Sequence, residues 1–299
     1  MRTLNFVSKS EFERLLSANI PAIEKAEMFA SFCRINTLYM ISKGGSGHIG
    51  TSFSCIEILT WLFLYELGLP GTDGEKDDAD IYFSSKGHDA PALYAVMTGL
   101  GLLDFDLIHK FRRLGGLPGH PDVGTPGIPT NTGSLGMGIS KAKGFTAADR
   151  LKGIERRIFV VTGDGELQEG QIWESLGSAV NNNMSNIYAI VDNNKIQSDT
   201  WVKDTSDTGD LVGKFAAFGW HAEHCNGNDL QAFSDALKNG AAVDLPKVIV
   251  ADTIKGRGVD FMEGNDLGED GLYRYHSGAP GEDEYLRANQ QLWDHTHSL

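Results

Sequence analysis

Short apolar runs alternate along this chain with longer segments in which apolar residues recur at helical spacing. Five of the short runs are predicted to be strands: 81–83, 157–162, 187–191, 220–224 and 246–253. Nearly continuous apolar runs of this length are typical of strands that are covered on both faces. Because helical segments separate the runs, we expect the α/β class, with a doubly wound parallel sheet and helices on both faces.

The intervening segments predict the helices. We expect them at 8–42, 51–67, 90–100, 133–148, 211–218, 229–241 and 282–293, with another directly after the glycine-rich turn near residue 165. Proline interrupts a helix, so Pro21 should divide the first one. Residues 197–210 are predicted to be a polar loop and 295–299 a frayed end. The stretch 115–133 is predicted to be a long irregular loop, which in a compact domain is usually functional.

Two polar turns, 163–165 and 193–196, follow two neighbouring predicted strands. Turns at the carboxyl ends of parallel strands meet at one edge of the sheet, where open α/β sheets bind ligands. Asp164 and Asn194 should therefore lie close together. With the backbone carbonyl of Ile196, they would offer the oxygen ligands that suit Mg²⁺ or Ca²⁺, completed by water and a diphosphate.

Glycine is abundant, with 36 residues, and it gathers in the predicted turns. Gly163 and Gly165 flank the carboxylate of the first turn. Without side chains, they would let phosphate oxygens approach the backbone N–H groups that open the next helix. The pattern favours a diphosphate as the ligand.

Three Gly-His pairs stand in irregular turns and contain His48, His88 and His120. At neutral pH an imidazole can donate a hydrogen bond to a diphosphate or a sugar hydroxyl, and it can shuttle protons. Lys255 follows the last predicted strand, where its charge would meet a phosphate or an anionic substrate. A solvated lysine is the alternative at that position.

Charge and composition narrow the class of partner. The net charge of −14 argues against a nucleic acid or an anionic membrane surface. The longest apolar run, 56–69, contains two glutamates and is too short to span a bilayer. Three cysteines without CxxC spacing indicate buried thiols in a reducing compartment, and the N-terminus lacks a leader pattern. We expect a cytoplasmic protein without nucleic-acid or membrane partners.

The turns together resemble a known family. Gly163-Asp164-Gly165 followed by Asn193-Asn194 resembles the thiamine-diphosphate motif, and 163–170 resembles the N-terminal domain of transketolase. The Gly-His segments and the segments 254–258 and 275–280 are similar to further transketolase segments. The sequence departs from the family at Ile49, where proline is usual, and at Ser134 and Met137.

The resemblance implies roles for particular residues. It implies that the four histidines His48, His88, His120 and His276 line the cofactor and the donor-sugar pocket and act in catalysis. His88 and His276 would also contact the cofactor, Gly133 and Leu135 would approach its two rings, and Glu169 would bind across a dimer interface. The full expected cofactor set is His88, Gly133, Leu135, Gly163, Asp164, Gly165, Glu169, Asn194, Lys255 and His276, and the metal set is Asp164, Asn194 and Ile196.

The resemblance runs from about residue 25 to residue 280 and implies one domain over 1–299, the diphosphate-binding (PP) domain of the thiamine-diphosphate-binding fold. Transketolases also carry a pyrimidine-binding domain, whose glutamate activates the cofactor, and a C-terminal domain. No residue here can be assigned that glutamate's role. We therefore expect both domains on a partner chain, a heterotetramer, and activity only with that partner.

The implied reaction is the transfer of a two-carbon ketol unit from a ketose phosphate to an aldose phosphate, with thiamine diphosphate and Mg²⁺ or Ca²⁺. One alternative is a transketolase specialised for a sulfonated or branched sugar, such as 6-deoxy-6-sulfofructose or apulose 4-phosphate. Others are another thiamine enzyme, such as a 2-oxo-acid dehydrogenase subunit, and a non-catalytic module that only binds thiamine diphosphate. The four histidines disfavour the last, because binding a diphosphate does not require them all.

Overall fold

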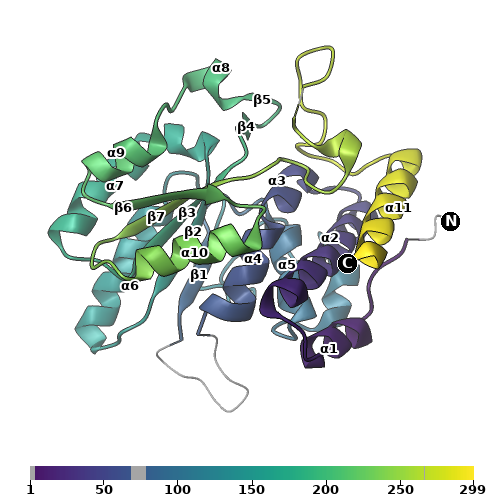
Figure 1. The fold of residues 1–299 in the computed structure, drawn as a ribbon, viewed down its shortest axis with the longest axis horizontal. Coiled ribbons are helices and arrows are strands. Elements are labelled where there is room, and N and C mark those ends of the chain that lie inside the picture. Colours follow the sequence, from purple (N-terminus) through teal and green to yellow (C-terminus); the bar gives the residue numbers. More distant parts are fainter. Residues whose placement is uncertain (1–3, 69–78, 266) are drawn as a thin grey trace.

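The protein is built on a five-stranded parallel sheet (Figure 1). The computed structural model describes residues 4–68, 79–265 and 267–299. The strand order is β1-β2-β3-β7-β6, with β1 at Ile81–Ser84, β2 at Ile158–Gly163, β3 at Ile187–Asn193, β6 at His221–Asn226 and β7 at Lys247–Asp252. Every neighbouring pair in this sheet is parallel, which confirms the predicted strands and their direction.

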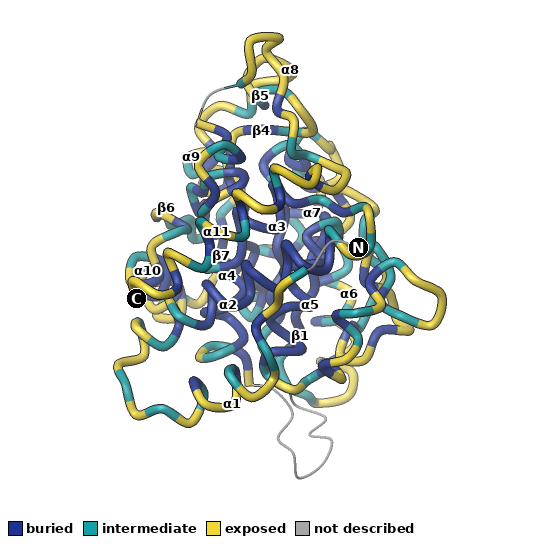
Figure 2. Tube along the Cα trace, turned by 90° about the vertical axis from the view of Figure 1, so that its right-hand side faces the viewer, coloured by how far each residue is buried: buried dark blue, intermediate teal, exposed yellow. Residues whose placement is uncertain are grey.

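Successive side chains of the central strands enter two separate cores. In β2, Phe159 and Val161 join one apolar cluster, while Ile158 and Val160 join the other. All these side chains are fully buried, and Figure 2 shows that buried residues gather in the centre of the molecule. Helices must therefore cover both faces, because a strand with two apolar faces is stable only when each face is packed.

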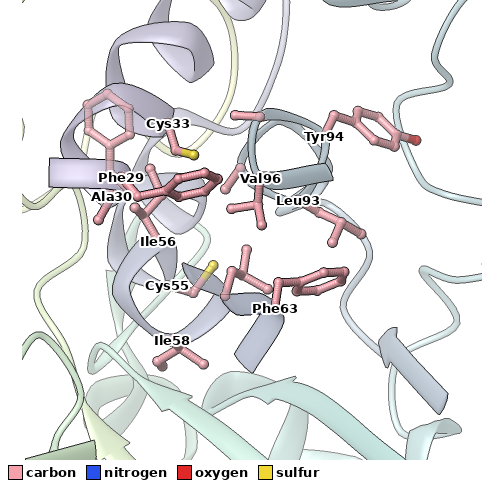
Figure 3. Close-up of a cluster of buried hydrophobic side chains, with 14 of the residues drawn as sticks. Phe29, Ala30, Cys33, Cys55, Ile56, Ile58, Phe63, Leu93, Tyr94 and Val96 are labelled. Atoms are coloured by element: carbon pink, nitrogen blue, oxygen red, sulfur yellow. The ribbon is translucent and has the colours of Figure 1, made fainter. Parts of the chain in front are cut away.

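Among the described residues, the larger core lies under seven α-helices. These are α1 (Lys9–Ser17), α2 (Ala22–Gly44), α3 (Ile49–Ser54), α4 (Ile56–Trp61), α5 (Ala90–Gly99), α10 (Leu230–Ala241) and α11 (Glu282–Ser298). Figure 3 shows its centre, where Cys33 of α2, Ile56 of α4 and Val96 of α5 point toward one another. All three cysteines of the chain are free and buried, as predicted.

In the part of the chain that the structure describes, three α-helices cover the other face of the sheet. They are α6 (Gly138–Lys152), α7 (Gly170–Asn181) and α9 (Leu211–Ala217), whose apolar residues form the second core with the strands. The doubly wound arrangement is thus confirmed. In the described part of the chain, every helix is too short or too polar to cross a lipid bilayer. Leu69, at the end of the longest apolar run, lies outside the described residues.

Pro21 separates α1 from α2, as predicted, but several other boundaries differ from the predictions. The helix predicted for 51–67 is divided at Cys55 and finishes in a π-helical turn, η1 (Leu62–Glu66). The helix predicted to begin at Gly133 begins at Gly138, because Gly133 and Gly136 adopt positive φ angles of 88° and 83°. Such angles exclude a right-handed helix.

Differences also occur on the carboxyl side of the chain. The helix after β2 begins as a 3₁₀ turn, η3 (Gly165–Gln168), and Glu169 is extended, so that α7 begins only at Gly170. The predicted polar loop contains a small hairpin, β4 (Ile196–Gln197) with β5 (Thr200–Trp201), and a short helix, α8 (Val202–Ser206). The C-terminal helix does not fray at 295, because Thr296 is buried and hydrogen-bonds Ser31 at 2.5 Å. Two further 3₁₀ turns are η2 (Phe105–Lys110) and η4 (Asp260–Met262).

Candidate functional site

A cavity of about 410 Å³ lies beyond the carboxyl ends of the central strands. Loops from far apart in the sequence form its wall, because parallel strands bring these ends to one edge. Every residue that the sequence predicted for the site lines this cavity: His48, His88, His120, Gly133, Leu135, Gly163, Asp164, Gly165, Glu169, Asn194, Ile196, Lys255 and His276. The structure thus brings the predicted residues together, while their roles toward a cofactor stay predictions.

The four predicted histidines form one cluster. The ring centre of His48 lies 5.0 Å from that of His88, 6.1 Å from that of His120 and 5.2 Å from that of His276. His88 is also 5.9 Å from His276, between ring centres. The four histidines come from four separate loops. They meet because the fold brings these loops together at one edge of the sheet, and their spacing in the sequence does not predict the distances.

Burial keeps these imidazoles uncharged. Loss of solvent lowers the pKa of His48 to about 4, and the neighbouring charges of His276 and Arg112 add to the effect. Burial also lowers the pKa of His276 to about 4, assisted by Lys255, and that of His88 to about 2, assisted by Lys86. The pKa of His120 is lowered in the same way. At neutral pH the cluster therefore offers neutral donors and acceptors of hydrogen bonds.

The turn after β3 joins the predicted metal residues. The carboxylate of Asp164 accepts from the backbone N–H of Gly165 at 2.8 Å and from that of Lys195. Asn194 Oδ1 accepts from the Ile196 N–H at 3.1 Å. These bonds connect the turn after β2 with the turn after β3, which is the juxtaposition that the two motifs predicted.

The donor set fits a hard divalent cation. Asp164 is 3 % exposed, and among the described residues no ion pair reaches its carboxylate. Burial, with Asp192 nearby, raises the pKa of Asp164 to about 6. A buried carboxylate without a cation partner, beside an amide and a carbonyl oxygen, is the chemistry that Mg²⁺ or Ca²⁺ uses. In the described chain, no three His, Cys, Asp or Glu side chains cluster as metal ligands, so a diphosphate and water would complete such a site.

Lys255 lies inside the cavity wall and is not solvated. Its Nζ donates to the carbonyls of Ile196 at 2.9 Å and Ser198 at 3.1 Å, and it lies 3.4 Å from His276 Nδ1. Burial lowers the pKa of Lys255 to about 8, although Asp164 and Asp192 act in the opposite direction. The alternative of a surface lysine is therefore wrong, because this cation is held beside the predicted metal turn.

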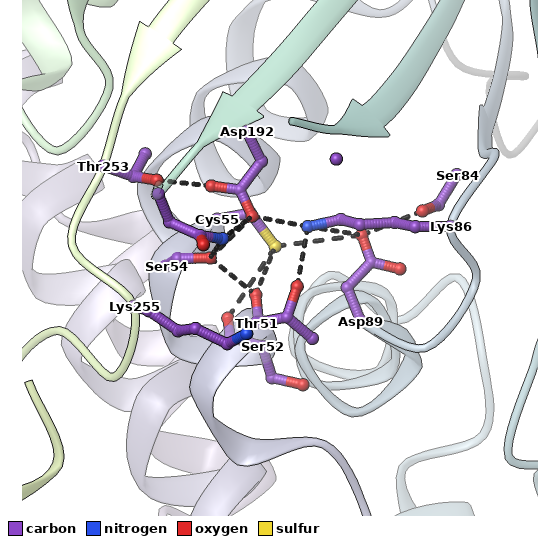
Figure 4. Close-up of polar contacts among 12 residues, drawn as sticks. Thr51, Ser52, Ser54, Cys55, Ser84, Lys86, Asp89, Asp192, Thr253 and Lys255 are labelled. Atoms are coloured by element: carbon purple, nitrogen blue, oxygen red, sulfur yellow. Dashed lines mark hydrogen bonds and ion pairs between the residues drawn. The ribbon is translucent and has the colours of Figure 1, made fainter. Parts of the chain in front are cut away.

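An ion pair that the sequence analysis missed begins in the cavity wall, where Lys86 is one of the lining residues (Figure 4). Lys86 Nζ donates to Asp192 Oδ2 at 2.5 Å and to Thr51 Oγ1 at 2.9 Å, and Asp89 lies 3.8 Å away. Burial alone would lower the pKa of Lys86, but its partner Asp192 outweighs that effect and raises it. Lys86 lies in a Gly-His segment and Asp192 precedes the asparagine pair, but nothing in the sequence shows that they meet.

Glu166 is a second residue that the sequence analysis missed. Its carboxylate accepts from the backbone N–H of Gly136 at 2.8 Å, from that of Gly163 at 3.2 Å and from the hydroxyl of Ser85. It thereby ties three loops of the cavity wall together from a buried position. Glu166 lies in the segment 163–170 that resembles transketolase, and this position could have drawn attention to it. An acidic residue in the first turn of a helix is, however, ordinarily explained by its favourable interaction with the helix dipole.

Two residues of the predicted cofactor set line the cavity and are also exposed at its mouth. They are Leu135, which is 44 % exposed, and Glu169. Gly133, at φ +88°, leaves no space for a side chain, since a Cβ atom there would lie 2.8 Å from His120 Cδ2. The apolar side chain of Leu135 thus remains uncovered where the predicted cofactor rings would lie.

Fold and site define a protein of the α/β class with a polar cavity at the carboxyl ends of its parallel strands. Residues 25–295 match the family described as "Transketolase, thiamine diphosphate binding domain". The chain belongs to this family. The match covers most of the chain, so the recognition made from the turns is confirmed.

Relatives of two lengths are similar to the chain. It is 36 % identical over 250 residues to an apulose-4-phosphate transketolase subunit of Actinobacillus succinogenes, covering 83 % of this chain and 88 % of that protein. It is 35 % identical over 238 residues to the 6-deoxy-6-sulfo-D-fructose transketolase subunit of a Clostridium species, covering 79 % and 86 %. Human transketolase is 33 % identical over 238 residues, which are 78 % of this chain and 38 % of that protein.

The fold is also that of solved transketolases. The structure of transketolase from Campylobacter jejuni superposes with a TM-score of 0.82 at 27 % identity, covering 91 % of this chain and 43 % of that one. The chain spans less than half the length of such full transketolases, and most of the length of the two relatives that are single subunits.

Proposed function

We propose that this protein is the N-terminal subunit of a split transketolase that depends on thiamine diphosphate and Mg²⁺. In this proposal it transfers a two-carbon ketol unit from a ketose to an aldose, together with a partner subunit. The observation that carries the proposal is the cluster of four neutral histidines beside the buried Asp164 turn. A site that only held a diphosphate would need the turn and not the cluster.

The residues of the turn would hold the metal and the diphosphate. Asp164, Asn194 and the Ile196 carbonyl supply oxygen ligands for Mg²⁺, with Ca²⁺ as the alternative. The backbone at Gly163 and Gly165, with the side chains of His88, Lys255 and His276, would contact the diphosphate. Gly133 and Leu135 would approach the rings, and Glu169 would bind across the interface between subunits.

The histidines would act on the sugar. When bound, thiamine diphosphate supplies the electron sink for breaking the carbon–carbon bond beside the ketose carbonyl. His48, His88, His120 and His276 would orient the sugar through hydrogen bonds, polarise its carbonyl and exchange hydroxyl protons. Their neutral state suits this work, because a neutral imidazole can either give or take a proton.

The partner is proposed from the relatives of similar length, whose names describe them as transketolase subunits. It would carry the pyrimidine-binding and C-terminal domains and form a heterotetramer with this chain, whose residues 1–299 would be one diphosphate-binding domain. The buried, unpaired cysteines fit the reducing cytoplasm as its compartment.

A specialised sugar is the second candidate. The two relatives of similar length are named for apulose 4-phosphate and for 6-deoxy-6-sulfo-D-fructose. In this reading the same site transfers the ketol unit, and the sugar's distal group is recognised largely by the partner. A panel of fructose 6-phosphate, sulfofructose and apulose 4-phosphate, assayed with the complete enzyme, separates these possibilities.

The proposal is tested by isolating the tagged chain from its native source and identifying what accompanies it. We expect a second subunit, and ketol transfer with thiamine diphosphate and Mg²⁺ only when both chains are present. A 2-oxo acid accepted in place of a ketose would favour another thiamine enzyme. A chain that is isolated alone, binds thiamine diphosphate and never turns over would favour the non-catalytic module.

The metal assignment is tested by Asp164→Asn. The amide oxygen of the variant can still accept from the Gly165 N–H. The substitution removes the only carboxylate of the proposed metal set, so Mg²⁺-dependent binding of thiamine diphosphate should be lost. Isothermal titration with the complete enzyme measures this. Asp235→Asn, on the exposed surface of α10, is the control, and unchanged affinity in Asp164→Asn would disprove the assignment.

A further inference from the structure

Lys195, between Asn194 and Ile196, has a left-handed backbone conformation that a residue other than glycine does not favour. Lys195 has φ +69°, in the left-handed region that side chains with a Cβ atom occupy at a cost. In this conformation its N–H is directed at the Asp164 carboxylate, and its carbonyl accepts from Val202 at 2.8 Å. The arrangement of the proposed metal ligands therefore depends on keeping one strained residue in place.

The side chain of Lys195 is held by Asp252, the last residue of β7. Lys195 Nζ donates to Asp252 Oδ1 at 2.7 Å. Asn193, which lies opposite Asp252 in the β3–β7 register, donates its side-chain amide to the same oxygen at 2.7 Å. His224 of β6 lies 3.1 Å from the second carboxylate oxygen. Asp252 thus joins the ends of three adjacent strands to the turn.

Asp252 acts from outside the cofactor cavity, whose lining does not include it. Asn193, Lys195 and His224 line a separate cavity of about 400 Å³, and Asp164 forms part of the wall of both. A contact in this second cavity can therefore influence the metal ligands without touching cofactor or sugar.

We propose that Asp252 is a positioning residue that holds the metal-binding turn in its left-handed conformation through Lys195. This inference rests on the proposed function, because it assumes that the turn binds the metal. The side chains of Lys195 and Asp252 are 52 % and 40 % exposed. A pair this exposed contributes little to global stability, so its effect should appear in metal affinity.

The test compares Lys195→Ala, Lys195→Gly, Asp252→Ala and the double variant Asp252→Ala/Lys195→Gly. Each tagged variant is used as isolated from its native source, with any partner it retains. Binding of Mn²⁺, a spectroscopic substitute for Mg²⁺, is measured by electron paramagnetic resonance with excess thiamine diphosphate. Glu223→Gln is the matched control, because it removes a carboxylate that pairs with His221 on β6 at 2.8 Å, away from the turn.

We expect Lys195→Ala and Asp252→Ala to weaken Mn²⁺ binding about fivefold, the factor that corresponds to the ~1 kcal/mol that an exposed ion pair can contribute to holding the left-handed turn. Glycine adopts this conformation freely, so Lys195→Gly should bind within about twofold of the wild type. In that background Asp252→Ala should have no further effect. If Asp252→Ala weakened Mn²⁺ binding only by destabilising the fold, glycine at position 195 would not restore the affinity.

Two results would overturn the inference. One is wild-type Mn²⁺ affinity in Asp252→Ala, and the other is a double variant as weak as Asp252→Ala alone. Failure of the wild-type protein to bind Mn²⁺ with thiamine diphosphate would instead contradict the proposed function. The two failures are therefore distinguishable in one experiment.

Discussion

Single residues of the cavity owe their chemistry to burial. His48 and His276 line the cavity, and desolvation lowers the pKa of each to about 4. Asp164 is affected in the opposite direction, because burial disfavours the charged form of an acid and a base alike. Burial therefore acts against acidic and basic charges alike in this cavity, and a metal and a diphosphate would bring charges of opposite sign.

The histidines predict how stability depends on pH. Their pKa values are lower in the folded protein than the ordinary 6.5, so the stability they contribute is complete above about pH 6.5 and is lost as the pH falls toward about 4. Replacing one of them with a side chain that does not titrate should make this loss shallower. We expect His276→Gln to lose less unfolding free energy than the wild type between about pH 7 and about pH 4.5.

Urea unfolding at both pH values measures this difference. His297→Gln, on the exposed last turn of α11, is the control and should keep the wild-type pH dependence. Parallel curves for His276→Gln and the wild type would contradict the assignment of a lowered pKa to His276.

At the scale of elements, buried polar contacts hold the strand ends in register. Lys86, in the loop after β1, reaches Asp192 at the end of β3 and passes below the turn at Gly163, where a Cβ atom would lie 3.8 Å from its Cδ. Asp192 also accepts from Ser54 of α3 at 2.6 Å. The contact links three elements at the cavity wall.

Breaking this ion pair should be costly. Lys86→Met leaves the Asp192 carboxylate buried without its cation, which ordinarily costs about 3–5 kcal/mol of unfolding free energy. Lys86→Met/Asp192→Asn should be less destabilised than Lys86→Met, because the charge of Asp192 is removed together with its cation and only Asp89 keeps a carboxylate there. Chemical denaturation measures both variants.

The control for the ion pair is Lys238→Met, whose partner Asp235 lies 3.4 Å away on the exposed surface of α10. Its loss should change stability by no more than about 0.5 kcal/mol. A Lys86→Met variant as stable as this control would show that the pair does not contribute to the fold.

At the scale of the whole molecule, the mouth of the cavity carries Leu135 and Glu169, which line it and are exposed. The apolar side chain of Leu135 is 44 % exposed. In the proposed function, a partner subunit covers this mouth and completes the site. Assembly should therefore depend on Leu135 more than on other exposed apolar side chains.

We expect Leu135→Asp to cause at least a tenfold loss in recovery of the partner, since it would bury an unpaired carboxylate in the interface. Co-purification with the tagged chain, quantified by the ratio of the two chains, measures the effect. Leu151→Asp is the matched control, because Leu151 is 91 % exposed at the far end of α6. Equal recovery from both variants would exclude Leu135 from the interface.

The local pattern predicted the elements well and their ends less well. Apolar runs located all five strands of the sheet, because strands buried on both faces need such runs. The start of α6 was predicted too early, because Gly133 and Gly136 adopt positive φ angles. A Cβ atom at either position would lie against His120 or Glu169, which are distant in the chain. The division at Cys55 has no local signal either.

The sequence alone determined the class of fold, the family and many of the residues that line the cavity, because glycine-rich turns and Gly-His pairs need particular residue types at fixed positions. Only the tertiary structure showed the ion pair of Lys86 with Asp192, the bonds of Glu166 and the contact of Asp252 with Lys195. The residues in these contacts lie far apart along the chain, and the sequence does not show that they are close in space. Burial acts in the same way, since a histidine acquires its lowered pKa only when other segments remove its water.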